Sequence, residues 1–406
     1  MVLNQKNEGI YILKNDMKQK RLIFSLLPIL SGFFVMGFVD IVGITSDYVQ
    51  RTFNWSHTVT GFVPFMVFIW FLFLGIPVGN QMNKWGRKKT VVISMVITIV
   101  GMMLPLVVYN SVTSFLAFAF LGIGNAILQV SLNPLLNNVL TNKKWLTSSL
   151  TAGQVIKALS SLIGPEIVLL AVARFGDDQW YYCFPILGAI TLLSALWLIA
   201  TPIPKEDMQI TKKAISYRDT FFLLKDKNIL LLFLGIFFIV GVDVGTNFIS
   251  SKVMVFRYGW SLDQAKFAPQ IYFLSRTIGA FLGAFLLSRM DEIKYFKFNM
   301  MACVVALLVF AFLPGENLSM IAVGAIGFFA SSIFPIIYSL ALQVNPRKSN
   351  EISGLMITAV AGGGIVTPLM GMATSSIGVL GGILVVLLCV LYLVFCAFSV
   401  RKPAYA

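Results

Sequence analysis

Residues 40–55 read Asp-Ile-Val-Gly-Ile-Thr-Ser-Asp-Tyr-Val-Gln-Arg-Thr-Phe-Asn-Trp and follow a long apolar run. A similar arrangement returns in the second half of the chain, where Asp243 follows another apolar run and leads to a Tyr-Gly-Trp segment. The aspartates Asp40 and Asp243 lie 203 residues apart, and Pro165 and Pro368 keep the same spacing. We therefore interpret the chain as two parallel copies of one design, and we expect its function to lie where the copies meet.

The composition indicates an integral membrane protein. Of the 406 residues, 58% are hydrophobic and 12% are charged, and the mean hydropathy is +0.85. A hydrocarbon core about 30 Å thick requires about 20 apolar residues per helix, and the apolar runs lack the alternation of a membrane β-barrel. We predict an all-α protein with twelve transmembrane helices, at Leu22–Ile44, Gly61–Met82, Thr90–Tyr109, Thr113–Leu140, Ser148–Ala171, Tyr181–Ala200, Ile229–Ser250, Phe267–Leu287, Phe296–Leu313, Leu318–Leu342, Ile352–Ala373 and Val379–Val400.

The repeat and the loop lengths predict the domain organisation. The first apolar run is too long for the core of a signal peptide and has no small-residue cleavage site after it, so we expect it to be retained as a helix. The longest loop, rich in charges, lies at the midpoint of the sequence and joins the two halves. The predicted parts are a cytoplasmic N-terminal segment 1–21, a six-helix bundle 22–200, a cytoplasmic linker 201–228, a second six-helix bundle 229–400 and a cytoplasmic tail 401–406.

The distribution of basic residues predicts the orientation. If the N-terminus is cytoplasmic, 24 of the 31 Lys and Arg lie on the cytoplasmic side, five lie in outer loops, and Lys157 and Arg276 lie within the membrane. This asymmetry follows the positive-inside rule. It predicts cytoplasmic termini in a plasma membrane or bacterial inner membrane, and it explains the net charge of +14 without a nucleic-acid partner.

Several chemical functions have no support in the sequence. The single histidine, His57, falls in a predicted outer loop, and the four cysteines fall in apolar segments where they are expected to be buried. No phosphate-binding Gly-x-x-x-x-Gly-Lys loop occurs, so ATP is not expected to drive the protein. With no hydrolytic, redox or metal-binding constellation, we expect neither an enzyme nor a cofactor.

A loop between the second and third predicted helices carries a recognisable motif. Residues 79–89 read Gly-Asn-Gln-Met-Asn-Lys-Trp-Gly-Arg-Lys-Lys. They resemble the Gly-x-x-x-Asp-Arg-x-Gly-Arg-Arg signature of the major facilitator superfamily, with Asn83 where the acid usually stands. Gly79 and Gly86 permit a tight turn, and Arg87 and Lys88 can cap helix C-termini. An ordinary cytoplasmic turn is the alternative. The resemblance implies two bundles that rock about a site near the bilayer midplane.

Helix 4 carries a stripe of amides. Asn125, Gln129, Asn133 and Asn137 recur every four residues, which places them on one helical face. Polar side chains at membrane depth usually face a cavity or a partner. The stripe therefore predicts a substrate site, with hydrogen bonding between helices as the alternative.

Charged and polar groups on other predicted helices extend this site. A charge at membrane depth costs about 2.5–3.5 kcal/mol on insertion scales and requires an anion, a cation or water beside it. Structural ion pairs, Asp40 with Lys157 or Asp243 with Arg276, are the alternative to a functional role. Besides the amide stripe, the candidate substrate-binding residues are Gln154, Lys157, Asn247, Gln270, Tyr272, Arg276 and Trp70, and the candidate cation-coupling residues are Asp40 and Asp243.

The stretch Gln129-Val-Ser-Leu-Asn133-Pro134 resembles Glu-Thr-Ala-Ala-Asn-Pro in the fucose permease branch of that superfamily. Arg276-x-x-Gly279 resembles helix 8 of the same branch. The resemblance implies a monosaccharide site at Gln129, Asn133 and the helix 5 position that Lys157 occupies. Two departures matter, because the branch has an acid in place of Gln129 and an amide in place of Lys157. The first weakens the case for proton coupling through helix 4, and the second favours an acidic substrate.

These observations predict a secondary transporter that carries a monosaccharide with H⁺ or Na⁺. The partners expected are a small-molecule substrate, the coupling ion and the lipid bilayer, and the protein is expected to act as a monomer. Three alternatives remain open: a transporter of hexuronates or other organic anions, a drug or metabolite exporter, and a transporter-like receptor without transport.

Overall fold

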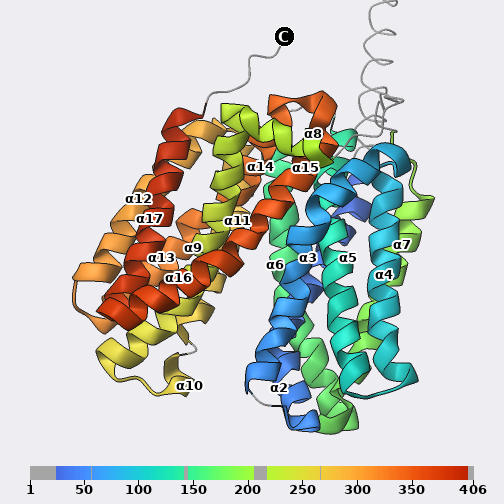
Figure 1. The fold of residues 1–406 in the computed structure, drawn as a ribbon, viewed down its shortest axis with the longest axis horizontal. Coiled ribbons are helices and arrows are strands. Elements are labelled where there is room, and N and C mark those ends of the chain that lie inside the picture. The colour runs from blue at the N-terminus through green and yellow to red at the C-terminus, as the bar shows by residue number, and fades with distance from the viewer. Residues whose placement is uncertain (1–23, 56, 141–144, 205–216, 266, 401–406) are drawn as a thin grey trace, which may run out of the picture.

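The computed structural model describes residues 24–55, 57–140, 145–204, 217–265 and 267–400, and its regular structure is helical throughout (Figure 1). Within these residues, twelve helical spans are long and apolar enough to cross a membrane. The prediction of a twelve-helix, all-α membrane protein is confirmed. The four cysteines are free and buried, whereas the side chain of His57 lies outside the described ones.

The first half begins with a helix over residues 24–36 and continues as η1 (Gly37–Ile41), α2 (Val42–Phe53), α3 (His57–Trp85), α4 (Arg87–Val107), α5 (Ser111–Val139), α6 (Leu146–Phe175), η3 (Asp177–Tyr182) and α7 (Cys183–Ala200). The linker contributes α8 (Tyr217–Phe222) and η4 (Leu223–Lys225). The second half contains α9 (Lys227–Tyr258), α10 (Leu262–Ala265), α11 (Phe267–Leu287), α12 (Glu292–Phe312), α13 (Glu316–Ala330), α14 (Ile333–Val344), η5 (Pro346–Lys348), α15 (Ser349–Thr358), η6 (Ala359–Ala361), α16 (Gly362–Ile377) and α17 (Val379–Ser399).

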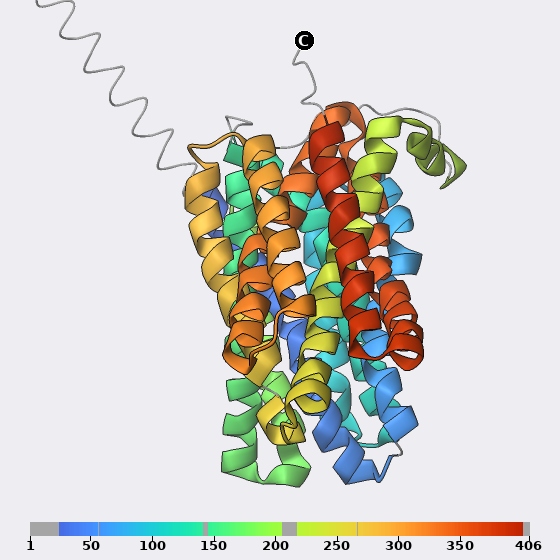
Figure 2. The ribbon, with the colours of Figure 1, turned by 90° about the vertical axis from the view of Figure 1, so that its left-hand side faces the viewer.

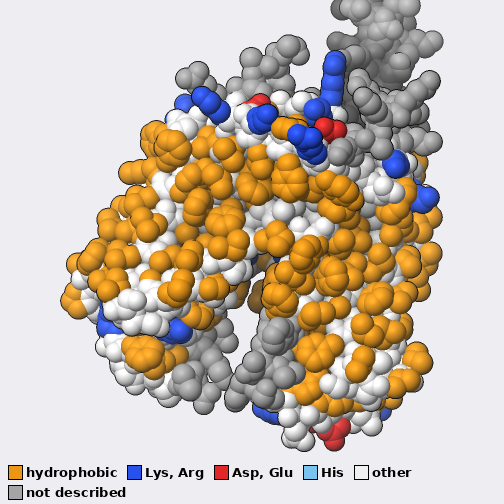
Figure 3. All heavy atoms as spheres, in the orientation of Figure 1, with side chains coloured by type: hydrophobic (Ala, Val, Ile, Leu, Met, Phe, Trp, Pro, Cys, Tyr) orange, Lys and Arg blue, Asp and Glu red, His pale blue; other side chains and the backbone are white. Residues whose placement is uncertain are grey.

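The two halves stand side by side with their long helices along a common axis (Figures 1 and 2). Helix α8 lies at one end of the molecule, and α2 and α10 lie at the tips of the two halves at the opposite end. A hollow between the halves opens at the end that carries α2 and α10, whereas the other end is closed and bears clustered Lys and Arg side chains (Figure 3). The structure therefore shows a conformation that is open at one end and closed at the other.

Three of the membrane spans depart from a regular α-helix. The first tightens to a 3₁₀-helix at η1, the tenth is interrupted by a turn at Ser331 and Ser332 between α13 and α14, and the eleventh tightens to a 3₁₀-helix at η6. In lipid, backbone groups freed by such breaks need partners within the protein. Ser331 supplies one such partner, because its hydroxyl donates to the carbonyl oxygen of Phe328 at 2.7 Å.

At the closed end, α15 of the second half packs along α3 of the first, and glycines make the close approach possible. A Cβ added to Gly75 would lie 2.7 Å from the carbonyl oxygen of Gly354. A Cβ added to Gly79 would lie 2.7 Å from the carbonyl oxygen of Asn350. Backbone meets backbone at this contact, so neither partner can move aside without separating the helices.

We predict that Gly354→Ala will loosen the closed end, because its added methyl group would meet the carbonyl oxygen of Gly75. Hydrogen exchange of the α15 amides should become faster, as the closed state loses its tightest contact. Gly371→Ala is the matched control, since a Cβ at Gly371 on α16 has no atom within 4 Å. Equal exchange rates in the two variants would show that the glycine contact does not hold the halves together.

Candidate functional site

Asp40 lies on η1, where the first membrane span is broken, and its side chain is exposed. Gly37 allows this segment to lie directly on α6, because a Cβ there would be 2.5 Å from the carbonyl oxygen of Lys157. The hydroxyl of Ser161, also on α6, donates to the Asp40 carboxylate. The 3₁₀ segment and the glycine together hold an exposed acid beside α6.

Lys157 is half-buried on the same helix. Within the part of the chain that the structure describes, its ammonium group makes no hydrogen bond or ion pair, and it is not within 4 Å of Asp40. The ion pair considered between Asp40 and Lys157 is therefore not formed in this conformation. Gln154, one turn before Lys157, is also half-buried.

The amides of α5 support the broken span and each other. Asn125 donates to the carbonyl oxygen of Met36, which immediately precedes η1, at 3.4 Å. Gln129 donates to Asn125 at 3.3 Å, and Asn133 donates to the backbone of Gln129 at 3.0 Å. All three side chains are buried. In this conformation the stripe stabilises the backbone next to η1 through the carbonyl oxygen of Met36. Gln129 is 8% exposed.

Tyr338 of α14 contributes to the contact between the halves, because its hydroxyl contacts Ser353 of α15. Ser353 in turn donates to the carbonyl oxygen of Val130 on α5 at 2.5 Å. These contacts join the halves near the middle of the membrane. Gln129 directly precedes Val130 on α5 and is therefore adjacent to this connection between the halves.

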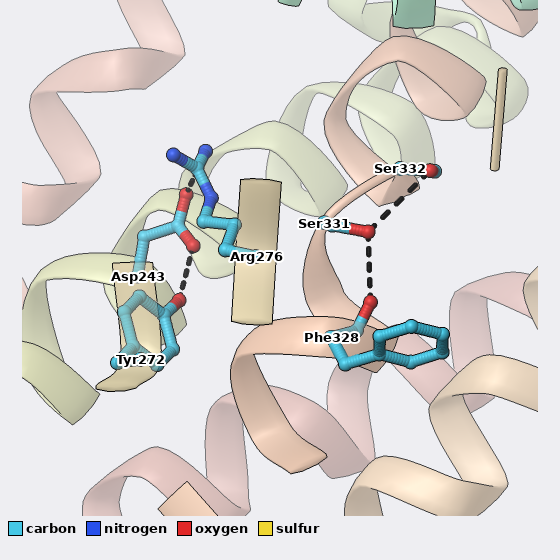
Figure 4. Close-up of polar contacts among 6 residues, drawn as sticks. All are labelled: Asp243, Tyr272, Arg276, Phe328, Ser331 and Ser332. Carbon is cyan, nitrogen blue, oxygen red and sulfur yellow. Dashed lines mark hydrogen bonds and ion pairs between the residues drawn. The ribbon is translucent and has the colours of Figure 1, made fainter. Parts of the chain in front are cut away.

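The second half contributes a closed cluster of three side chains (Figure 4). Arg276 on α11 donates to one oxygen of Asp243 on α9 at 2.8 Å, and the hydroxyl of Tyr272 donates to the other oxygen. Tyr272 is fully buried, whereas the side chains of Arg276 and Asp243 are 33% and 21% exposed. Both carboxylate oxygens of Asp243 are thus engaged, and the guanidinium group is held in a fixed position.

The two half-sites lie on neighbouring helices, because α6, which supports Asp40, packs against α11, which carries Arg276. The other predicted residues lie around this region without described side-chain hydrogen bonds: Gln270 is exposed, Asn247 is half-buried, and Trp70 is half-buried with its indole N–H buried and unpaired.

The loop motif forms part of the closed end. Gly86 adopts a positive φ of 82°, which explains the glycine. Arg87 is buried and donates to Asn350 at 2.7 Å and to Ser349, both in the second half, and to the carbonyl oxygen of Pro134 at 3.1 Å in its own. Lys88 donates to the carbonyl oxygens of Ile199 and Thr201 at 2.9 and 2.8 Å, capping the end of α7 as predicted.

Sequence reasoning missed the residues that the motif meets. Asn83 donates to Glu351 at 2.8 Å and accepts from Asn350 at 2.7 Å. The acid that the loop itself lacks is therefore supplied by the first turn of α15. A second connection between the halves is formed by Thr147, which donates to Glu292 and contacts Ser339. The available signal was the cluster of polar residues from 349 to 351, directly before an apolar run.

Comparison with known proteins gives the same architecture. The family model described as Major Facilitator Superfamily matches residues 29–368. The chain is 25% identical to the glucose/galactose transporter of Brucella abortus, over 93% of this chain and 94% of that protein. The crystal structure of the transporter FucP in the outward conformation matches with a TM-score of 0.82 at 19% identity, over 94% of this chain and 100% of that one. The proton:xylose symporter XylE matches with a TM-score of 0.70 at 15% identity, over 94% and 95% of the two chains.

We predict that Asp243→Asn will lower stability by about 1–3 kcal/mol, because it leaves a partly buried guanidinium group without its anion. The double variant Asp243→Asn, Arg276→Gln should recover part of this loss, since it removes the unpaired charge as well. Thermal unfolding in detergent measures both. The single variant Arg276→Gln completes the comparison. If the stability losses of the two single variants simply add in the double variant, the two residues are not coupled.

Proposed function

The chain belongs to the major facilitator superfamily, and from this we propose that it is a secondary active transporter that carries a monosaccharide together with H⁺ or Na⁺. The resemblance to the sugar-transporting branch of the superfamily is supported over nearly the whole chain by the Brucella abortus glucose/galactose transporter. The proton:xylose symporter XylE shares the fold. Transport would proceed by alternating access, with the hollow between the halves as the route to the site.

The observation that carries the proposal is the exposed carboxylate of Asp40 at membrane depth. It lies on the 3₁₀ segment of the first span, its side chain is exposed, and its described partner is a serine rather than a cation. A charged group in such a position is costly unless water or an ion reaches it. Asp243 is a weaker candidate for coupling, because Arg276 and Tyr272 occupy both of its oxygens.

The contacts of Ser161 provide a place for a proton at Asp40. Its hydroxyl lies in hydrogen-bond contact with the Asp40 carboxylate and, at 3.0 Å, with the carbonyl oxygen of Lys157. A hydroxyl carries one hydrogen, so it can serve both oxygens fully only when Asp40 is protonated and donates to it. Proton binding at Asp40 therefore completes a hydrogen-bonded chain from η1 to the backbone of α6.

Substrate binding is assigned to groups that offer hydrogen bonds toward the hollow. Gln129 lies on α5 and Lys157 and Gln154 lie on α6, and Arg276 lies on α11, which packs against α6 from the second half. Convergent donors of this kind suit a ligand with several hydroxyl groups.

The orientation is part of the proposal. The termini and the linker lie in the cytoplasm, the hollow opens outward, and the protein acts as a monomer in the plasma or bacterial inner membrane. Single cysteines at Asn317, an exposed residue of α13, and at Thr211, which lies outside the described residues, should label from opposite sides of the membrane. Labelling of both from one side would contradict this topology.

We predict that Asp40→Asn will abolish gradient-driven accumulation and leave substrate exchange measurable, because the variant keeps the shape of the site and loses the group that titrates. Counterflow and accumulation in proteoliposomes, with imposed pH or Na⁺ gradients and a panel of hexoses and hexuronates, distinguish the two activities. Gln129→Ala is the comparison variant, which should weaken substrate binding without uncoupling. Accumulation at the wild-type level in Asp40→Asn would exclude this residue as the coupling site.

A further inference from the structure

Lys157 is a cation at membrane depth for which the described part of the chain provides no anion. Its helix position places it about ten residues into the membrane span, near the middle at 1.5 Å per residue. The nearest acid on the neighbouring segment, Asp40, is engaged by Ser161 and forms no ion pair with Lys157. An ammonium group at this depth is stabilised by an anion or by water that reaches it.

The charged pair of the second half is already matched. Arg276 and Asp243 form an ion pair at 2.8 Å, and Tyr272 engages the remaining oxygen of Asp243, so this cluster is neutral as a unit. In the first half, Asp40 and Lys157 carry opposite charges and form no ion pair with each other. When Asp40 takes up a proton, the site is left with one uncompensated positive charge, on Lys157.

We infer that the substrate is a monosaccharide that bears a carboxylate, such as a hexuronate, and that its carboxylate binds the ammonium group of Lys157. This inference rests on the proposed function and specifies its substrate class. The sugar hydroxyls meet Gln129, Gln154 and the fixed guanidinium group of Arg276. One monovalent cation at Asp40 and one carboxylate at Lys157 enter together, so the loaded site has the same net charge as the empty one.

The arrangement also explains why the two charges are kept apart in the open state. A lysine already paired with Asp40 would have to break that pair before a carboxylate could bind. Ser161 donates to Asp40 while Lys157 remains unpaired, so the cation can bind Asp40 and the carboxylate can bind Lys157 without first breaking an ion pair. A neutral sugar would instead leave Lys157 without an anion once Asp40 is protonated, which is unfavourable when the site closes and water leaves.

The experiment measures uptake of radiolabelled D-glucuronate and D-galacturonate, and separately of D-glucose, D-galactose and L-fucose, into proteoliposomes that contain the full chain. Wild-type protein is expected to take up a hexuronate, and the neutral sugars should compete poorly. Lys157→Asn should raise KM for the hexuronate by about 10–100-fold, as expected for loss of a charge-assisted contact. Lys225→Asn, which removes an exposed lysine from η4, is the matched control and should leave uptake unchanged.

Folding of each variant is checked by its elution profile and thermal unfolding in detergent. A second measurement needs no variant: hexuronate uptake driven by a cation gradient should not change when a membrane potential is imposed, because no net charge moves. Uptake of neutral hexoses without competition from hexuronates, or uptake that follows the potential, would overturn the inference and leave the proposed function intact. Failure to carry any monosaccharide would overturn both.

Discussion

A charged side chain within a bilayer must have a partner, and this requirement explains the arrangement at the centre of the protein. Among the described residues, the candidate site contains four charges, and each is placed by a specific feature of the fold. Asp243 and Arg276 neutralise each other on neighbouring helices, with Tyr272 buried beneath them. Asp40 lies on a break in the first span, supported by Ser161, and Lys157 lies one turn away on the same supporting helix. In the second half, the charges of the candidate site therefore form an ion pair. In the first half, Asp40 and Lys157 form no ion pair with each other.

The closed end is held by a different kind of interaction. Glycines at 75, 79 and 354 bring two backbones into contact, and buried polar side chains then join the halves at the same level. Arg87 is the first residue of the third transmembrane helix of the first half, and Glu292 is the first residue of the corresponding helix of the second half. Each contacts the start of a helix in the opposite half, at Ser349 and Thr147. The internal repeat thus supplies two related connections, one centred on a cation and one on an acid. Both must separate if the hollow is to open on the other side.

Much of the fold could be predicted from the sequence because long apolar runs, basic loops and a repeat of Asp40 at Asp243 are all local signals. The site was predicted less completely. The sequence indicated which polar residues lie in the membrane, but an amide on α5 can face a cavity or a neighbouring backbone, and Asn125 does the latter. The partners of the loop motif lie more than 250 residues away, at Asn350 and Glu351, so no local pattern connects them. The same holds for the choice between two possible ion pairs, of which only that between Asp243 and Arg276 is formed.

Transport by alternating access requires the two halves to move about the charged site. Spin labels at Arg51 and Glu316, exposed residues at the open ends of the two halves, report the width of the hollow, and labels at Lys84 and Lys348 report the closed end. Electron–electron distance measurements with and without a transported sugar test the movement. Alternating access predicts that substrate and coupling ion together shorten the first distance and lengthen the second in part of the population. Two distances that stay fixed under saturating substrate and ion, in protein that transports, would contradict it.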